Sequence, residues 1–172
     1  KGKIIIGICG GFQILGKEIK DDKGAEGIPK TCEGLGLLNI TTVFADEKTL
    51  TQYEGRLKNT SGILENLDGE EIYGYEIHQG VSFSETEISI TEDKFLKALV
   101  KDNVFGTYIH GIFENNSVTE KIINAVREKK GYSPEKLKET FEEYREKEFD
   151  KLEKIMRENL DIKKIYEIIF KK

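Results

Sequence analysis

The stretch that decides the fold begins with Lys3-Ile-Ile-Ile-Gly-Ile8 and continues directly into Cys9-Gly-Gly-Phe-Gln-Ile-Leu-Gly16. The first part is short, apolar and rich in β-branched residues, a pattern that predicts a strand buried on both faces, as in a parallel sheet. In the second part, behind the two glycines, the apolar residues change to helical spacing. A buried strand, a glycine-flanked turn and a helix in this order indicate an α/β fold.

The rest of the chain alternates short strands with turns and then becomes helical. Strands are predicted at residues 40–44, 51–57, 72–78, 81–84, 87–90 and 104–109, and residues 20–36 are predicted to form a loop. Ser117 and Glu120 predict a capping box for a helix that ends at Gly131. Ser133-Pro134 predicts the start of a last long helix, and Asp161 is placed to cap a final short one.

These elements predict one α/β domain, residues 1–131, with a helical C-terminal extension, residues 132–172, packed on the same domain. A strand buried on both faces needs a neighbour on each side, and no strand is predicted before the first one. We therefore expect the sheet to begin upstream of residue 1, so that the N-terminal part of the domain is missing from this sequence.

Composition excludes several classes of function. Lys and Arg total 27 against 32 Asp and Glu, which gives a net charge of −5 and argues against a general nucleic-acid binder. No apolar run approaches the roughly 20 residues that cross a bilayer, so no membrane partner is expected.

Cys9 and Cys32 lie in unlike contexts, which favours a reducing cytoplasm over a disulfide scaffold, and Cys32 is interpreted as a free thiol. With two histidines and dispersed cysteines, no ligand spacing suggests a metal site.

Cys9 is the first candidate for chemistry. On a turn between a buried strand and a helix, its sulfur would be exposed above the sheet and would face the positive end of the helix, which favours the thiolate. Gly10 and Gly11 allow the turn to tighten, and the N–H of Gly10 would point at an oxyanion formed during attack on a carbonyl. This arrangement is a nucleophile elbow built around cysteine. The alternative is a small buried cysteine that fills space beside a tight turn.

A cysteine nucleophile needs a base, and the sequence holds two histidines, His78 and His110. His110 follows the predicted strand 104–109, and the carboxyl ends of strands share one crevice in an open parallel sheet, so His110 is expected to meet Cys9 there. The alternative for His110 is a structural role, as a capping or core residue. For His78, a structural and a catalytic role both stay open, and Glu76 is placed either to orient His78 or to face a ligand.

Four motifs and the tail together resemble a known family. The segment Gly7-Ile-Cys-Gly-Gly-Phe-Gln-Ile-Leu-Gly16 resembles the nucleophile motif of class I (triad-type) glutamine amidotransferases, and in particular their cobyric and cobyrinic acid synthase branch. The later motifs of that branch are matched in the same order by Glu33-Gly-Leu-Gly-Leu-Leu38, Gly74-Tyr-Glu-Ile-His78 and Gly106-Thr-Tyr-Ile-His-Gly-Ile-Phe-Glu114. The tail from Phe141 to Ile169 is similar to the end of the cobyric acid synthases, so the resemblance spans almost the whole chain.

The resemblance implies a flavodoxin-like sheet and a glutaminase that supplies ammonia for ATP-dependent amidation of corrinoid carboxylates in cobalamin biosynthesis. It implies that Cys9 attacks the side-chain amide of glutamine, that His110 is base and acid, and that Gly10 offers an oxyanion N–H. It also implies that Gln13 contacts the bound glutamine. His78 and Glu76 are further candidates for substrate binding. No cofactor is expected in this domain, whereas ATP, Mg²⁺ and a corrinoid of the cobyrinic acid a,c-diamide type are expected at a synthetase domain.

Two departures from the family pattern bear on activity. Many amidotransferases have His-Pro-Glu, whose Glu orients the imidazole, whereas Gly111 and Ile112 follow His110 and Glu114 is four positions on. The third catalytic residue is therefore unassigned. The synthetase domain and the first part of the amidotransferase domain, with its other oxyanion loop, are absent from the sequence, so we do not expect this segment to catalyse synthesis alone.

Three alternatives stay open at this point. One is an amidotransferase subunit that amidates peptidoglycan lipid precursors, against which the helical tail after Tyr132 counts. Another is a catalytically inactive docking module, against which the retained Cys9 and His110 count, because docking requires neither. The last is a cysteine hydrolase on a related α/β fold, which would react with electrophiles other than glutamine analogues.

Overall fold

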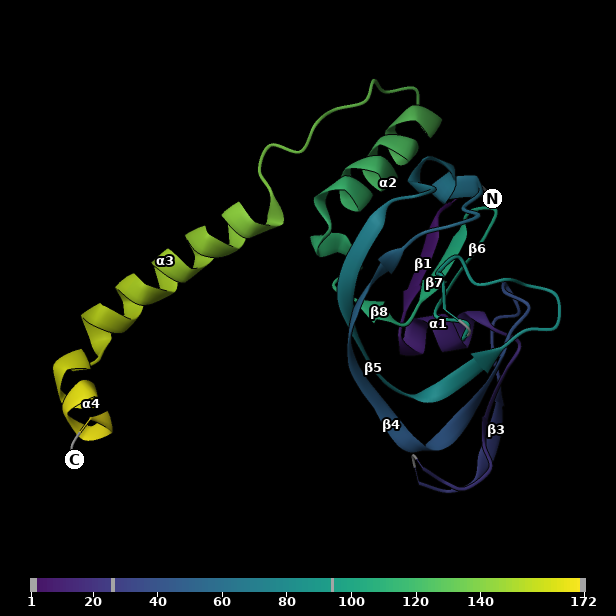
Figure 1. The fold of residues 1–172 in the computed structure, drawn as a ribbon, viewed down its shortest axis with the longest axis horizontal. Helices are drawn as coiled ribbons and strands as arrows, with labels where there is room; N and C mark the ends of the chain where they lie inside the picture. Colours follow the sequence, from purple (N-terminus) through teal and green to yellow (C-terminus); the bar gives the residue numbers. More distant parts are fainter. Residues whose placement is uncertain (1–2, 26, 94, 171–172) are drawn as a thin grey trace. The chain divides into compact units, whose positions relative to one another are not determined.

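A computed structural model describes residues 3–25, 27–93 and 95–170, and the chain divides into two compact units, one up to Lys136 and one from Leu137. The first unit contains two β-sheets with α1 and α2, and the second contains α3 and α4 (Figure 1). The predicted mixed α/β class is therefore confirmed. The predicted boundary at residues 131 and 132, and the packing of the extension on the domain, stay predictions.

The described elements follow one another in this order. They are β1 (Ile5–Ile8), α1 (Gly10–Leu15), β2 (Glu18–Asp21), β3 (Lys30–Glu33), β4 (Thr41–Arg56), the 3-10 helix η1 (Gly62–Leu67), β5 (Glu71–Phe83), β6 (Ala98–Lys101), β7 (Val104–Thr107), β8 (Ile109–His110), the 3-10 helix η2 (Ile112–Glu114), α2 (Asn116–Lys129), α3 (Phe141–Asn159) and α4 (Ile162–Ile169).

The smaller sheet has the strand order β1-β7-β6, and β1 runs parallel to β7 with Ile8 opposite Thr107. The strand and helix predicted from the opening segment are thus both present. Gly7 lets them approach, because a Cβ at this position would lie 2.5 Å from the carbonyl oxygen of Gly11 and 2.6 Å from Cδ1 of Leu15. The turn between β1 and α1 is consequently tight.

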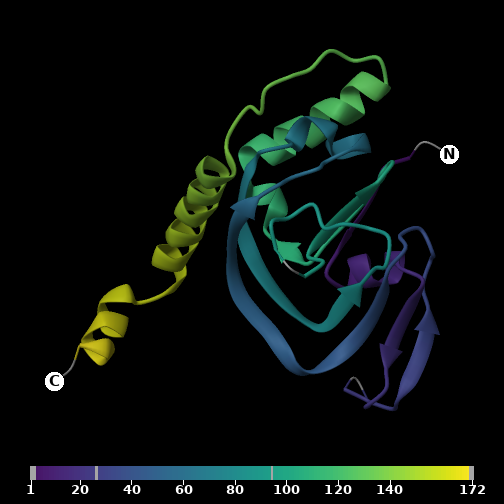
Figure 2. The same ribbon diagram turned by 45° about the vertical axis from the view of Figure 1, so that its right-hand side comes forward.

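The larger sheet has the strand order β3-β2-β4-β5-β8. Its main feature is the long antiparallel ribbon of β4 and β5, which curves around the small sheet in both views of the chain (Figures 1 and 2). The register of the ribbon shifts between Phe44 and Thr49, and this irregularity lies within a ribbon that bends. The outer edge of β5 carries the two-residue strand β8.

Several predicted strands differ from the observed ones. The predicted strands 72–78 and 81–84 are one strand, β5, and residues 87–90 form none. The predicted loop 20–36 contains parts of β2 and β3, which pair as an antiparallel hairpin. The predicted strand 104–109 is broken at Tyr108, where the chain leaves β7 of the small sheet and enters β8 of the large one.

Two predicted helix starts are also wrong. Ser117 lies inside α2 and its hydroxyl donates to Glu70, so it forms no capping box. The last long helix begins at Phe141 rather than after Ser133-Pro134, because Thr140 and Glu143 form the capping box there. Asp161 caps α4 as predicted, through a bond from the N–H of Lys164.

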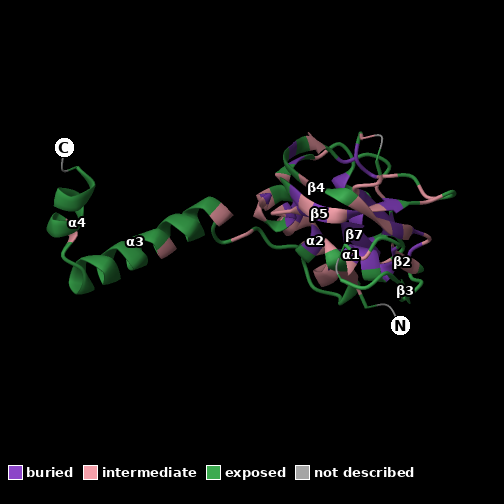
Figure 3. Cartoon of the chain, turned by 90° about the horizontal axis from the view of Figure 1, so that it is seen from below, coloured by how far each residue is buried: buried purple, intermediate pink, exposed green. Residues whose placement is uncertain are grey.

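The core lies in the first unit (Figure 3). One buried cluster surrounds α1, and it includes Phe12, Leu15, Leu38, Ile40, Leu99, Val104 and Tyr108. A larger cluster packs the inner side of the ribbon against η1 and α2. Among the described residues of α3 and α4, none is buried. No helix in the described part of the chain is long and apolar enough to cross a membrane.

Candidate active site

The backbone of Cys9 has a rare conformation. Its φ of 54° and ψ of −114° are unfavourable for any residue with a Cβ, and such a conformation costs roughly 1–3 kcal/mol. The N–H of Cys9 donates to the carbonyl of Thr107 (2.8 Å), and the carbonyl of Cys9 accepts from the N–H of Gln13 (3.1 Å). These bonds hold Cys9 between β7 and the first turn of α1, as in the sharp strand-to-helix turn of a nucleophile elbow.

The side chain of Cys9 points toward β5. Its Sγ lies 3.5 Å from the carbonyl oxygen of Ile77, and the residue is partly exposed. Gly10 is the first residue of α1, so its N–H is one of the donors that have no partner within the helix. The sulfur and a free helix N-terminus therefore lie next to each other.

His110 reaches β5 from the other direction, through β8. It lies opposite Tyr75 in the antiparallel ladder, and the two rings are stacked with centroids 5.0 Å apart and an interplanar angle of 12°. Gly74 makes this approach possible, because a Cβ there would lie 2.1 Å from the carbonyl oxygen of His110. The Nε2 of His110 is buried and has no hydrogen-bond partner among the described residues.

Cys9 and His110 thus converge on one short stretch of β5. Cys9 contacts the backbone of Ile77 and His110 pairs with Tyr75, two residues earlier on the same strand. Two residues of an extended strand span about 7 Å. Both predicted residues therefore contact β5, two positions apart along the strand, and their catalytic roles stay predictions.

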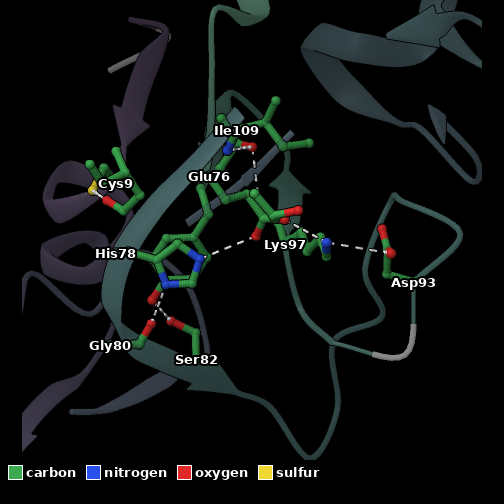
Figure 4. Close-up of polar contacts among 12 residues, drawn as sticks. Cys9, Glu76, His78, Gly80, Ser82, Asp93, Lys97 and Ile109 are labelled. Atoms are coloured by element: carbon green, nitrogen blue, oxygen red, sulfur yellow. Dashed lines mark hydrogen bonds and ion pairs between the residues drawn. The ribbon is translucent and has the colours of Figure 1, made fainter. Parts of the chain in front are cut away.

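His78 and Glu76 form a separate buried cluster (Figure 4). Nδ1 of His78 donates to the carbonyl of Gly80 (2.7 Å), and Nε2 faces the Glu76 carboxylate (3.1 Å). The other carboxylate oxygen of Glu76 accepts from Nζ of Lys97 (2.5 Å). Burial favours a higher pKa for Glu76, but hydrogen bonds from His78 and Lys97 outweigh it and hold the pKa below its ordinary value.

The two ring nitrogens of His78 are therefore both engaged by acceptors. A histidine bound in this way has no free nitrogen to take a proton from a thiol. Of the two roles that the sequence left open for His78, the hydrogen bonds favour the structural one. The contact of Glu76 with Nε2 of His78 likewise favours an orienting role, and substrate binding by either residue stays a prediction.

A third group of side chains links Gln13 to Tyr108 and Ser82 through hydrogen bonds. The side chain of Gln13 is 7% exposed, and its amide donates to the hydroxyl of Tyr108 (3.4 Å). The Tyr108 hydroxyl also lies 2.7 Å from that of Ser82, and its ring is stacked on His78 with centroids 3.8 Å apart. Burial raises the pKa of Tyr108, so its hydroxyl keeps its proton. The predicted contact of Gln13 with glutamine stays a prediction.

The sequence reasoning overlooked Tyr75 and Tyr108, although both lie inside quoted motifs. Tyr108 lies two residues before His110 in a predicted strand, whereas the contact of Tyr75 with His110 follows only from the register of β5 and β8. The other predicted thiol, Cys32, is exposed on β3 and lies opposite Ile19. Among the described residues, no group of three or more His, Cys, Asp or Glu side chains is arranged to hold a metal ion.

Comparison with known proteins identifies the family of this chain. Residues 1–118 match the family described as the CobB/CobQ-like glutamine amidotransferase domain. The chain belongs to this family. It is 45% identical over 181 residues to a cobyric acid synthase of Thermoanaerobacter sp. (strain X514), which covers 98% of this chain and 36% of that protein. The motif resemblance and the flavodoxin-like class that it implied are thereby confirmed.

Two further relatives are also cobyric acid synthases. Cobyric acid synthases of Clostridium botulinum (strain Loch Maree / Type A3) and Dehalococcoides mccartyi (strain CBDB1) are 42% identical over 176 residues and 41% identical over 179 residues. These matches cover 96% and 98% of this chain, and 34% and 35% of the relatives. This amidotransferase domain therefore spans about a third of the length of the curated relatives that it matches.

Proposed function

We propose that this amidotransferase domain releases ammonia from glutamine through a thioester on Cys9. The observation that carries the proposal is the backbone of Cys9, whose φ of 54° and ψ of −114° are maintained at a turn between a strand and a helix. Strain of this kind persists where the surrounding structure enforces it, and it is concentrated at active sites.

In the first half-reaction, His110 accepts the thiol proton and Sγ of Cys9 attacks the side-chain carbonyl carbon of glutamine. The N–H of Gly10 donates to the oxyanion that forms. The carbon–nitrogen bond then breaks as His110 returns the proton to the leaving nitrogen. The products are ammonia and a γ-glutamyl thioester.

In the second half-reaction, His110 takes a proton from water, and the resulting hydroxide attacks the thioester carbonyl. Glutamate leaves as Cys9 is restored, so the sum is glutamine plus water to glutamate plus ammonia. The buried Nε2 of His110 supports this role, because buried polar atoms are rarely left without a partner and this one has none among the described residues.

The proposed acceptor of the ammonia is a corrinoid side-chain carboxylate. The support is that cobyric acid synthases match this chain over 96–98% of its length, including the C-terminal helices. On this proposal the protein acts in the cytoplasm, and a synthetase domain outside this sequence binds ATP and Mg²⁺ and activates the carboxylates of a cobyrinic acid a,c-diamide type of substrate. Gln13 remains the proposed contact for glutamine.

A diazoketone analogue of glutamine tests the glutaminase. In the full-length polypeptide that carries this sequence, we expect one covalent adduct on Cys9, located by peptide mass, whose formation glutamine slows. Cys9→Ser should give no adduct, and the matched variant Cys32→Ser should react like the parent. A folded protein that gives no adduct would overturn the proposal and favour the docking module.

The acceptor is tested with glutamine labelled with ¹⁵N in its side-chain amide, together with ATP, Mg²⁺ and the corrinoid. The label should enter the corrinoid with the parent protein and not with Cys9→Ser, which should still use added ammonium. Label in a peptidoglycan lipid precursor instead would replace the corrinoid assignment and leave the glutaminase intact.

A further inference from the structure

The sequence directly after His110 lacks the carboxylate that commonly orients a catalytic histidine. In cysteine–histidine pairs the base is itself held by a third group, commonly a carboxylate. Gly111 and Ile112 follow His110, and neither has a polar side chain. The nearest carboxylate in the sequence, Glu114, belongs to η2, and it does not bind Nε2 of His110, which has no hydrogen-bond partner among the described residues.

The ring of Tyr75 instead lies against the face of the His110 imidazole. It is nearly parallel to the imidazole of His110, at 12°, with the centroids 5.0 Å apart. Directly opposite residues in an antiparallel ladder have the closest side chains, so the register brings the two side chains together. The approach of Gly74 to the carbonyl of His110 leaves no room for a larger residue that would separate the strands.

The opposite face of β5 fixes the backbone from which Tyr75 projects. Alternate residues of a strand point to opposite faces, and the neighbour of Tyr75, Glu76, is 2% exposed and paired with Lys97 and His78. Tyr75 itself is 41% exposed, so the burial of its ring in a core does not account for its orientation. The contact that accounts for it is the imidazole of His110.

We propose that Tyr75 is a positioning residue that orients His110 by stacking, in place of a carboxylate. The inference rests on the proposed function of the domain. A stacked ring covers the face of the imidazole, restricts its rotation, and leaves both ring nitrogens open in the ring plane. When His110 takes the proton of Cys9, the face of the phenol also stabilises the imidazolium.

The test compares Tyr75→Leu with Tyr75→Phe in the full-length polypeptide, by glutaminase kinetics and by the rate of the diazoketone reaction at Cys9. Misplacing a catalytic group by about 1 Å costs roughly a hundredfold in rate. We expect Tyr75→Leu to lower kcat about ten- to a hundredfold at an unchanged KM, and Tyr75→Phe to restore it because the stack remains. The thermal midpoints of all variants are measured to confirm that they fold.

Two further variants make the test decisive. Phe83→Leu removes another exposed aromatic ring from β5, one that is not stacked on His110, and it should retain the parental kcat. Glu114→Gln tests the competing carboxylate. Parental kinetics in Tyr75→Leu, or a loss confined to Glu114→Gln, would overturn the inference while the parent's reaction upholds the glutaminase. An inert parent would overturn both proposals.

Discussion

At the scale of single residues, the site depends on a conflict between a side chain and its backbone. Cys9 has a Cβ, yet its φ is 54° and its ψ is −114°. A glycine adopts this conformation without the clash, so only the chemistry of the thiol explains a cysteine here. The sequence predicted a tight turn from Gly10 and Gly11, but the strain itself lies at Cys9 and could not be predicted from residue types.

This conflict gives a stability prediction. Cys9→Gly and Cys9→Ala both remove the thiol, but only the alanine variant keeps the strained Cβ. Relief of the strain is offset in part by the greater flexibility of glycine in the unfolded chain. We expect Cys9→Gly to be the more stable of the two by about 1 kcal/mol, measured by urea denaturation. An alanine variant more stable than the glycine variant by about 0.4–1 kcal/mol, the unfolded-state cost of glycine alone, would show that the turn stores no strain.

The base could be predicted from the sequence, but its partner could not. His110 was chosen because it follows a strand and because a thiol needs a base. The contact between Tyr75 and His110 follows only from the register of β5 and β8, which places residues 35 positions apart directly opposite each other. Pairing between distant strands depends on the whole sheet, and no local pattern around Tyr75 encodes it.

At the scale of elements, the sequence predicted most strands and misjudged their ends. The run 104–109 is rich in β-branched and aromatic residues, a pattern that predicts a single strand. The chain instead changes sheets at Tyr108, whose buried ring contacts Phe12 and His78 and whose hydroxyl binds Gln13. Tertiary contacts of one residue therefore break the strand and bring His110 to the edge of β5.

The start of α3 was also predicted wrongly, because tertiary contacts override a local signal. Ser133-Pro134 is a good helix start in isolation. Ser133, however, accepts from Nε of Arg127, and the N–H of Glu135 donates to Asn124, so α2 holds this segment in an extended form. The capping box of Thr140 and Glu143 was present in the sequence and was the stronger signal.

The two sheets are also linked by an ion pair that depends on pH. Glu76 on β5 binds Lys97, which directly precedes β6, and both side chains are largely buried. The folded-state pKa of Glu76 lies below the ordinary value of 4.5. A depressed folded-state pKa contributes stability that is present above the unfolded value and is lost as the pH falls toward the folded one.

We therefore expect the free energy of unfolding to fall between about pH 5 and pH 3 more steeply in the parent than in Glu76→Gln, because the amide cannot be protonated in this range. Urea titrations at several pH values measure both slopes. Glu71→Gln, on the same strand but exposed, is the matched control and should keep the parental slope. Parallel curves for the parent and Glu76→Gln would show that Glu76 does not contribute.

At the scale of the whole molecule, the chain consists of two units that meet at residues 136 and 137. The sequence predicted a helical extension because an apolar stripe follows the last glycine, and this part of the organisation is present as α3 and α4. The exact division could not be predicted, because it depends on where the side chains of α2 stop holding the chain. Arg127 and Asn124 hold it as far as Glu135.

This arrangement predicts where a protease cuts first at the end of the domain. Lys136 and Lys138 are exposed, and the chain around them is neither helix nor strand, whereas Lys147 and Lys151 lie within α3. Cleavage requires an extended, accessible backbone, so trypsin should cut after Lys136 or Lys138 before it cuts inside α3. Masses of the earliest fragments locate the cut, and a Lys136→Gln, Lys138→Gln double variant should lose it. Early cleavage after Lys147 or Lys151 would mean that α3 opens more readily than the segment before it.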